Sequence, residues 1–284
     1  HRSPRKRGHP PGAQEKPQTV LISIHIPKTA GTAWRLMIEA NAGQQASFVS
    51  VEARDRNDTA TRALALIDSG QEDEARMLVE AAGCQMIHGH RADAFLKLFP
   101  NAPAIIWLRE PKPRLLSEYT HLKTFRREEG KLGQAIHAGE ADLGDLARAR
   151  SQIYTRLEAR LKEHPGGYIA MLTERSDQAA RTFHAALGWR GRLARRNVAP
   201  RMSGETLDAL VDGQNEALDE ILASDRSIHD QWRQLWDSGE AGERAMQLLQ
   251  AGPRRQPPPL RHYLRRLAGI GKERLGRALG RDWR

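Results

Sequence analysis

Short apolar runs alternate along this chain with stretches whose apolar residues are spaced as on one face of a helix. The runs span residues 20–26, 84–90, 102–109 and 167–174. Their length and their apolar, partly β-branched composition are typical of buried strands. Because each run is followed by a helical pattern, we predict an α/β fold of three layers, with a mainly parallel central sheet flanked by helices.

The helical segments have recognisable start and stop signals. The first follows Thr32 and should end at Asn41 and Gly43, and Asp68–Gly70 should separate two helices within residues 57–82. We expect Ser176 to cap a helix that runs through Leu187 and stops at Gly188. Further helical patterns begin at Pro111 and cover residues 128–163 and 203–236.

Composition divides the chain into three parts. Residues 1–18 are rich in Pro, Arg and Gly and almost lack apolar side chains, so we expect a disordered basic tail. We assign residues 19–250 to one folded domain. Residues 251–284 form a Pro-rich linker and a basic amphipathic tail, of the kind that lies on an anionic membrane or docks on a partner.

The net charge of +10 lies in the tails. Residues 1–16 carry +4 and residues 254–284 carry +8, so subtraction leaves −2 for residues 17–253. A body without excess positive charge argues against binding to a nucleic-acid backbone, and we expect no specific nucleic-acid partner.

The sequence contains neither a signal-peptide pattern nor a run of roughly 18 apolar residues that would span a membrane. With Cys84 as the single cysteine, no internal disulfide can form. We therefore expect a cytoplasmic protein, with peripheral membrane contact through the C-terminal tail as one option. An anchor upstream of His1 is the alternative.

The segment from His25 to Thr32, HIPKTAGT, joins the first strand to the first helix. Such a loop directs backbone N–H groups and the positive end of a helix dipole at one place, which attracts an anion. Lys28 adds a full charge, Thr29 and Thr32 add hydroxyl donors, and Gly31 permits close approach of a ligand. The order of Lys and Gly differs from the nucleotide-triphosphate loop G-x-x-x-x-G-K-[ST].

Two further groups of polar residues stand at strand ends. His88 and His90 are spaced to point the same way, but no third metal ligand stands at a recognisable spacing, so we expect no metal. Arg109 ends another strand, and Ser117 lies in the next helix, where a guanidinium and a hydroxyl could hold one phosphate. Arg114 either belongs to this group or is a solvated surface charge.

The loop His25–Thr32 resembles the phosphosulfate-binding loop of sulfotransferases, in the branch of the heparan-sulfate O-sulfotransferases and their bacterial relatives. Three other segments are similar to motifs of that family: His88-Gly-His90, the R-x-P-x-x-R-x-x-S-x-Y pattern from Arg109, and Thr173-Glu174-Arg with the later Leu-Gly-Trp189. Ala33 and Glu110 depart from it, since Ser or Thr and Asp or Asn are usual there.

The resemblance implies a P-loop-like fold and a PAPS-dependent enzyme that transfers a sulfuryl group to a hydroxyl of a carbohydrate or glycolipid. It implies that residues 28–32, namely Lys28, Thr29, Ala30, Gly31 and Thr32, hold the 5′-phosphosulfate. Arg109 and Ser117 would hold the 3′-phosphate. Lys28 would stabilise the leaving group. His90 would act at the acceptor, with His88 as the second candidate for that role.

Three alternatives remain open from the sequence. A kinase-like phosphoryl-transfer enzyme would use a similar loop, but it should show a Mg²⁺-binding Asp at a strand end. A non-catalytic nucleic-acid binder would need a basic body. A membrane-associated protein would rely on the C-terminal tail.

Overall fold

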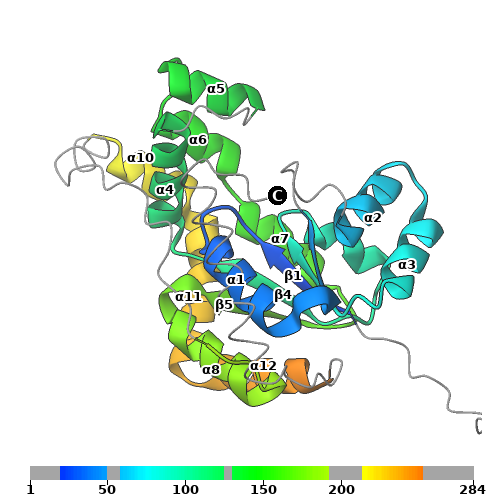
Figure 1. The fold of residues 1–284 in the computed structure, drawn as a ribbon. Coiled ribbons are helices and arrows are strands. Elements are labelled where there is room, and N and C mark those ends of the chain that lie inside the picture. Colours follow the sequence, from blue (N-terminus) through cyan, green and yellow to red (C-terminus); the bar gives the residue numbers. More distant parts are fainter. Residues whose placement is uncertain (1–19, 50–57, 125–129, 192–212, 252–284) are drawn as a thin grey trace, which may run out of the picture.

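The computed structural model describes residues 20–49, 58–124, 130–191 and 213–251. Five strands form one sheet in the order β2-β3-β1-β4-β5, and every neighbouring pair is parallel. The strands are β1 Leu21–His25, β2 Ala46–Val49, β3 Met86–Gly89, β4 Ala104–Leu108 and β5 Tyr168–Leu172. The predicted α/β architecture with a parallel central sheet flanked by helices is confirmed (Figure 1).

Helices connect the strands and cover the sheet. They are α1 Gly31–Ala42, α2 Thr59–Asp68, α3 Glu72–Ala81, α4 Pro111–Thr124, α5 Gly130–Ala138, α6 Leu143–Arg150, α7 Ile153–Lys162, α8 Ser176–Leu187, α10 Asn215–Ile221, α11 Ala223–Asp237 and α12 Glu240–Ala251. Short 3₁₀ helices are η1 Gly43–Gln45, η3 Ala92–Lys97 and η4 Thr173–Arg175. The predicted break between α2 and α3 and the stop signals of α1 and α8 are confirmed, with Gly188 left-handed at the end of α8.

The order in which the chain adds strands to the sheet reverses at β1. After β1 the chain builds β2 and β3 on one side, and it then crosses to build β4 and β5 on the other. In parallel sheets of this kind, ligands bind beyond the carboxyl ends of the strands where the order reverses. The loops that follow β1, β3 and β4 therefore meet at the edge expected to bind a ligand.

Aromatic side chains pack α1 and α8 against the sheet. Trp34 of α1 and Trp107 of β4 have ring centroids 3.6 Å apart, and Phe183 of α8 contacts both rings. All three side chains are essentially inaccessible to solvent. Burying such rings is worth several kcal/mol in total at about 25 cal/mol per Å². This packing fixes the start of α1, and thus the preceding loop, relative to the strands.

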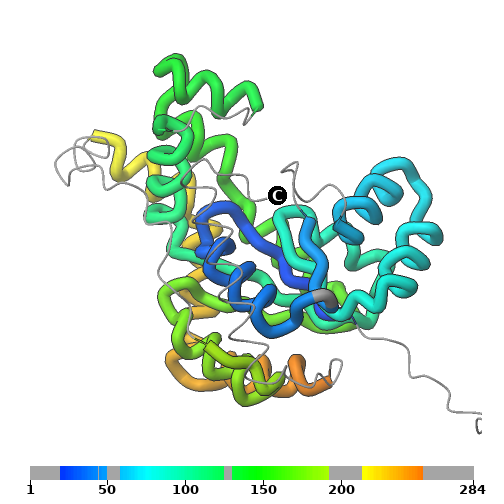
Figure 2. The backbone as a smooth tube through the Cα atoms, in the orientation of Figure 1, coloured from blue at the N-terminus to red at the C-terminus, as the bar shows by residue number. Residues whose placement is uncertain are grey.

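A second, smaller core lies away from the sheet. Its members come from α4, α5, α6 and α10: Leu115, Tyr119, Leu122, Ile136, Leu143, Leu146, Ala147, Leu218 and Leu222. In Figure 2 these helices form an arm in which α5 lies farthest from the strands. The stretch 128–163, predicted only to be helical, therefore packs through α5 and α6 against α4 and α10.

Three sequence predictions need correction. Strand β2 was not predicted, because its four residues follow η1 directly and lack a longer apolar run. Ser176 is the first residue of α8, while Arg175 occupies the cap position without a side-chain cap bond. Helix α12 continues the packing beyond the predicted helices, and Ala241, Ala245 and Leu249 are buried on its inner side.

Both predicted tails lie outside the described residues, as does most of the arginine-rich stretch after Trp189. None of the helices in the described ranges combines the length and the apolar composition that a membrane span needs.

Candidate active site

The loop between β1 and α1 has an unusual backbone. Lys28 and Ala30 have φ angles of 69° and 63°, in the left-handed region that residues with a Cβ atom seldom adopt. Each such residue costs about 1 kcal/mol or more, so the surrounding packing must hold the loop in this shape. Left-handed residues alternating with ordinary ones are typical of the concave backbone nests that bind anions.

This loop runs directly into α1. The carbonyl of Ala30 accepts hydrogen bonds from the backbone N–H groups of Ala33 and Trp34, at 2.9 and 3.2 Å. The first N–H groups of an α-helix have no intrahelical carbonyl partner, and the helix dipole there favours negative charge. The predicted strand, loop and helix are thus confirmed, and partly buried Lys28 lies within the loop.

Thr29 has a different role from the one expected of its hydroxyl. The Oγ1 atom donates a hydrogen bond to the Ile26 carbonyl at 2.8 Å, and the residue is fully buried. Since a hydroxyl has one proton to donate, this one closes the loop and cannot also bind a phosphate oxygen. Thr29 would contribute to an anion site through its backbone, whereas Thr32 is partly exposed at the start of α1.

Gly31 leaves room for an imidazole ring. A Cβ atom at this position would lie 2.0 Å from both Cε1 and Nε2 of His25. From the sequence we predicted that the absence of a side chain at Gly31 would let a ligand approach. In the structure the His25 ring occupies this space. The glycine therefore lets the end of β1 and the start of α1 approach each other.

Three histidines from neighbouring strands lie together at this edge. The His25 ring centroid is 4.5 Å from that of His90 and 5.7 Å from that of His88. Burial is the main cause that holds the pKa of His25 well below its ordinary value, and the neighbouring His90 and His88 add to it. Within the described ranges, no three or more His, Cys, Asp or Glu side chains are grouped as metal ligands would be.

His88 lies in the interior. It is 4% exposed, and its Nδ1 is 2.9 Å from the Ser23 hydroxyl, which also accepts a hydrogen bond from the Trp107 indole N–H at 3.0 Å. Burial, with the nearby His90 second, lowers the pKa of His88 to about 3. The ring is therefore neutral. Its contact with Ser23 joins β3 to β1, and the bond from Trp107 to Ser23 joins β4 to the same hydroxyl.

His90 is exposed, immediately after β3. Its Nδ1 is 2.9 Å from the backbone carbonyl of His25. A carbonyl only accepts, so Nδ1 must carry the proton and the lone pair of the neutral ring must be on Nε2. Partial burial lowers the pKa of His90, against the opposing effects of this hydrogen bond and of Glu118. A neutral imidazole with a basic Nε2 is the form that a general base requires.

Arg109 reaches the anion loop from the end of β4. Its guanidinium Nη1 donates to the backbone carbonyl of Lys28, at 3.3 Å. This bond joins residues 81 positions apart in the sequence and brings the Arg109 guanidinium to the backbone of the anion loop. Two side chains from other strand ends therefore contact the backbone of residues 25–28: His90 at the His25 carbonyl and Arg109 at the Lys28 carbonyl.

Helix α4 holds the other two residues of the predicted phosphate group. Ser117 is partly buried in its second turn. Arg114 is completely buried, pairs with Glu118 at 3.0 Å and lies over the Tyr154 ring. A solvated surface charge is thus excluded for Arg114, although its Nε and Nη2 atoms have no hydrogen-bond partner within the described structure.

The arginine-rich stretch is described only at its start. The backbone N–H and carbonyl of Arg190 bond to the side chain of Asn41, at 2.8 and 3.0 Å. These bonds join the chain after α8 to the end of α1. The other arginines of this stretch, Arg192, Arg195, Arg196 and Arg201, lie outside the described residues.

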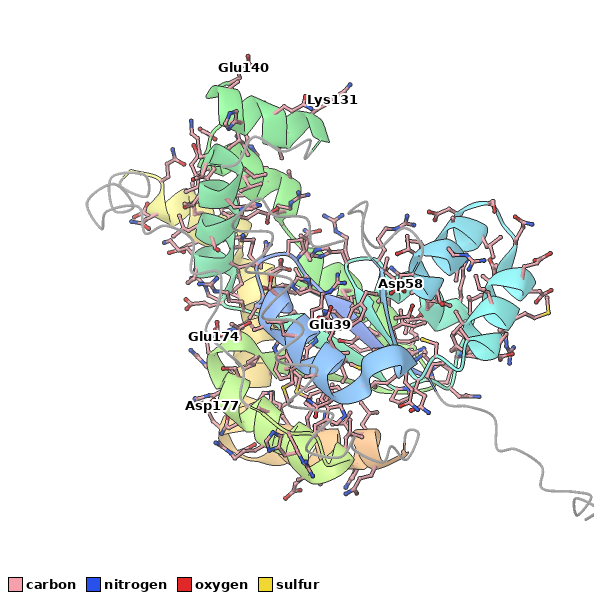
Figure 3. All side chains as sticks on the ribbon, viewed as in Figure 1. Glu39, Asp58, Lys131, Glu140, Glu174 and Asp177 are labelled. Atoms are coloured by element: carbon pink, nitrogen blue, oxygen red, sulfur yellow. The ribbon has the colours of Figure 1, made fainter. Side chains whose placement is uncertain are left out.

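Two residues near the site were not identified from the sequence as functional. His25 was considered only as part of the loop, and Tyr154 had no motif to mark it because it meets Arg109 across 45 positions. Glu174, labelled in Figure 3, was named only as part of the Thr173-Glu174-Arg motif, and no functional role was predicted for it.

Comparison with known proteins adds no relative: no protein-family model matches the chain, and no curated protein matches it.

Proposed function

We propose that this chain is a PAPS-dependent sulfotransferase that acts on a hydroxyl of a carbohydrate or glycolipid. One observation supports the proposal most. The ends of three neighbouring strands bring together a cationic loop, a guanidinium and a neutral imidazole, with Arg109 bonded to the Lys28 carbonyl and His90 to the His25 carbonyl. Transfer of a sulfuryl group from a phosphate to a hydroxyl requires positive groups that stabilise the departing phosphate and a base that accepts the hydroxyl proton.

The residues present fit a donor with two separate phosphate groups. The nest of residues 28–32 and the start of α1 would hold the 5′-phosphosulfate, and Arg109 with Ser117 would hold the 3′-phosphate. When bound, PAPS supplies the sulfuryl group: the acceptor oxygen bonds to sulfur, the bond from sulfur to the 5′-phosphate oxygen breaks, and adenosine 3′,5′-bisphosphate leaves.

Lys28 and His90 would divide the chemical work. Lys28 would stabilise the negative charge that develops on the 5′-phosphate as the leaving group departs. His90 would accept the acceptor hydroxyl proton on Nε2, the nitrogen left basic by the bond from Nδ1 to the His25 carbonyl. His88 would support the site from beneath, since it is buried against Ser23.

A kinase-like reaction has less support. Such an enzyme needs a carboxylate free to bind Mg²⁺ at a strand end. The acidic side chain that follows β5 is Glu174, and its two oxygens contact the Glu110 N–H at 2.8 Å and His229 at 3.4 Å. The described strands β1, β3 and β4 lead instead into His25, His90 and Arg109.

Ligand selectivity tests this proposal. Adenosine 3′,5′-bisphosphate should raise the melting temperature of the protein more than AMP or ATP at equal concentration, because a ligand that binds the native state stabilises it more the further its concentration exceeds its Kd. Thermal unfolding with each ligand provides the measurement. Equal stabilisation by AMP and the bisphosphate would show that the 3′-phosphate site is wrongly assigned.

A further inference from the structure

The backbone around Arg109 is fixed by side chains from elsewhere in the chain. We call residues 108–110 the Arg109 turn. The Tyr154 hydroxyl donates to the Arg109 carbonyl at 2.6 Å and accepts from the Arg109 N–H at 3.3 Å. One phenol oxygen thus bonds both backbone groups of the residue whose guanidinium reaches the anion loop.

The residues that follow β5 hold the two sides of the same turn. Thr173 Oγ1 donates to the Leu108 carbonyl at 2.9 Å, and the Glu174 carboxylate accepts from the Glu110 N–H at 2.8 Å. A strand end normally leaves such groups to water. Here the polar backbone groups next to Arg109 have side-chain partners on both sides.

Tyr154 is itself firmly held. Asp225 Oδ1 on α11 accepts the backbone N–H groups of Tyr154 and Thr155, each at 3.1 Å, at the start of α7. The buried guanidinium of Arg114 lies 5.8 Å from the centroid of the Tyr154 ring. Burial raises the pKa of the Tyr154 hydroxyl, so this group remains a hydrogen-bond donor.

Glu174 is supported from the same helix. Its second carboxylate oxygen lies 3.4 Å from Nε2 of His229, which is one helical turn beyond Asp225 on α11 and equally buried. Partial burial acts to raise the pKa of Glu174, but the bonds from His229 and the Glu110 N–H lower it overall. Helix α11 therefore braces the Arg109 turn by two routes, through Tyr154 and through Glu174.

We infer that Tyr154 and Glu174 are positioning residues that aim the Arg109 guanidinium at the 3′-phosphate of the donor, an inference that rests on the proposed function. Arginine is long and flexible, so a site that relies on it gains affinity when its backbone is held in the binding geometry before the ligand arrives. Neither residue needs to contact the donor itself.

The chain provides a matched control for Tyr154. Tyr168 is a second tyrosine of the folded body, and its hydroxyl bonds to Glu158 at 3.1 Å, away from the Arg109 turn. Tyr154→Phe and Tyr168→Phe each remove one hydroxyl and keep the ring. Only the first change removes bonds to the backbone of Arg109.

The test is calorimetric titration of the full chain with adenosine 3′,5′-bisphosphate and with AMP. Tyr154→Phe should weaken bisphosphate binding about tenfold and change AMP binding by less than about twofold. In an Arg109→Ala background, Tyr154→Phe should cause almost no further loss, because the group that it positions is already absent. Tyr168→Phe should leave both affinities unchanged.

Other outcomes separate this inference from the proposed function. If the unmodified chain binds AMP as tightly as the bisphosphate, the 3′-phosphate site fails and the inference fails with it. If that preference exists but Tyr154→Phe weakens both ligands equally, or adds its full effect to Arg109→Ala, the inference alone is overturned.

A second pair of variants covers the case in which Tyr154→Phe does not fold. Glu174→Gln keeps an oxygen that can accept from the Glu110 N–H, whereas Glu174→Ala does not. We expect the alanine variant to lose preference for the bisphosphate over AMP and the glutamine variant to recover most of it. If both variants preferred the bisphosphate over AMP as strongly as the unmodified chain does, the positioning role of Glu174 would be overturned.

Discussion

A single ring nitrogen, Nε2 of His90, has the proton-transfer role in the proposed reaction. The bond from Nδ1 to the His25 carbonyl selects the tautomer that exposes this lone pair. In the same proposed reaction, Lys28 would act at the opposite end of the transfer, on the leaving phosphate. Since the two residues serve different partners, their loss should have different effects on ligand binding.

Lys28→Ala and His90→Ala should each lower turnover by about two orders of magnitude, as expected for losing a charge stabiliser or a general base. Lys28→Ala should also weaken adenosine 3′,5′-bisphosphate, whereas His90→Ala should bind it almost normally. Steady-state kinetics combined with titration of the bisphosphate would measure both effects.

His88→Ala is the control at this scale. Its ring is neutral and buried against Ser23, so its loss should affect stability more than the chemical step. Near-normal turnover in His90→Ala together with complete loss in His88→Ala would instead assign the base to His88.

The pH profile provides a check on the same assignment. The folded-state pKa of His90 is lowered from its ordinary value, so the neutral base is present above that lowered pKa and is lost as pH falls through it. Turnover should therefore decline only below about pH 6.5, the ordinary histidine pKa. The residual turnover of His90→Ala should lack this decline, and an unchanged profile in that variant would contradict the assignment.

The sequence was sufficient to predict which residue types stand at the strand ends, but not all of their contacts. Lys28 and Arg109 were both predicted for the site, and their contact follows from the parallel sheet. The Thr29 hydroxyl was misassigned because its bond to Ile26 depends on the turn of the loop. Tyr154 could not be predicted, because its partner is a backbone group 45 positions away.

At the scale of elements, α4 connects the site with the helical arm through a buried ion network. Glu118 is 5% exposed and pairs with Arg114 at 3.0 Å and with Arg150 at 2.8 Å. Arg114 is fully buried, whereas the Arg150 side chain is 39% exposed. The Glu118 carboxylate thus has one buried and one exposed partner. Substituting Glu118 and Arg150 separately can therefore distinguish what the two ion pairs contribute to the stability of the fold.

Glu118→Gln should destabilise the fold by about 3 to 5 kcal/mol, because it leaves the buried Arg114 charge without its partner. Arg150→Gln should cost no more than about 1 kcal/mol, as is usual for an exposed pair. Chemical denaturation of both variants would measure the difference. Equal and small losses would mean that water reaches Arg114.

Most elements could be predicted because their apolar periodicity is long enough to identify. The break at Asp68–Gly70 and the stop at Gly188 are local signals that the structure confirms. Strand β2 has only four residues and is defined by its pairing with β3, which is a tertiary contact. The second core beneath α5 likewise depends on α10, which is distant in the sequence.

At the scale of the whole molecule, the distribution of charge and the strand order both favour a local site for a small anion at the carboxyl ends of the strands. The segment 17–253 has a net charge of −2, so the positive groups at the anion loop act locally and not as part of a broadly basic surface. The parallel order β2-β3-β1-β4-β5 brings the loops after β1, β3 and β4 to this edge. A small anionic ligand fits that arrangement better than a nucleic-acid backbone does.

Transfer of label from the donor to an acceptor would measure the proposed sulfotransferase activity itself. The full chain would be incubated with PAPS carrying radiolabelled sulfate and a panel of desulfated heparan oligosaccharides and neutral glycolipids. A parallel set would contain ATP labelled in its γ-phosphate. We expect label to move from PAPS to at least one acceptor, Lys28→Ala to slow this transfer by about two orders of magnitude, and ATP to label no acceptor. Transfer from ATP, with none from PAPS to the same acceptors, would contradict the proposed function.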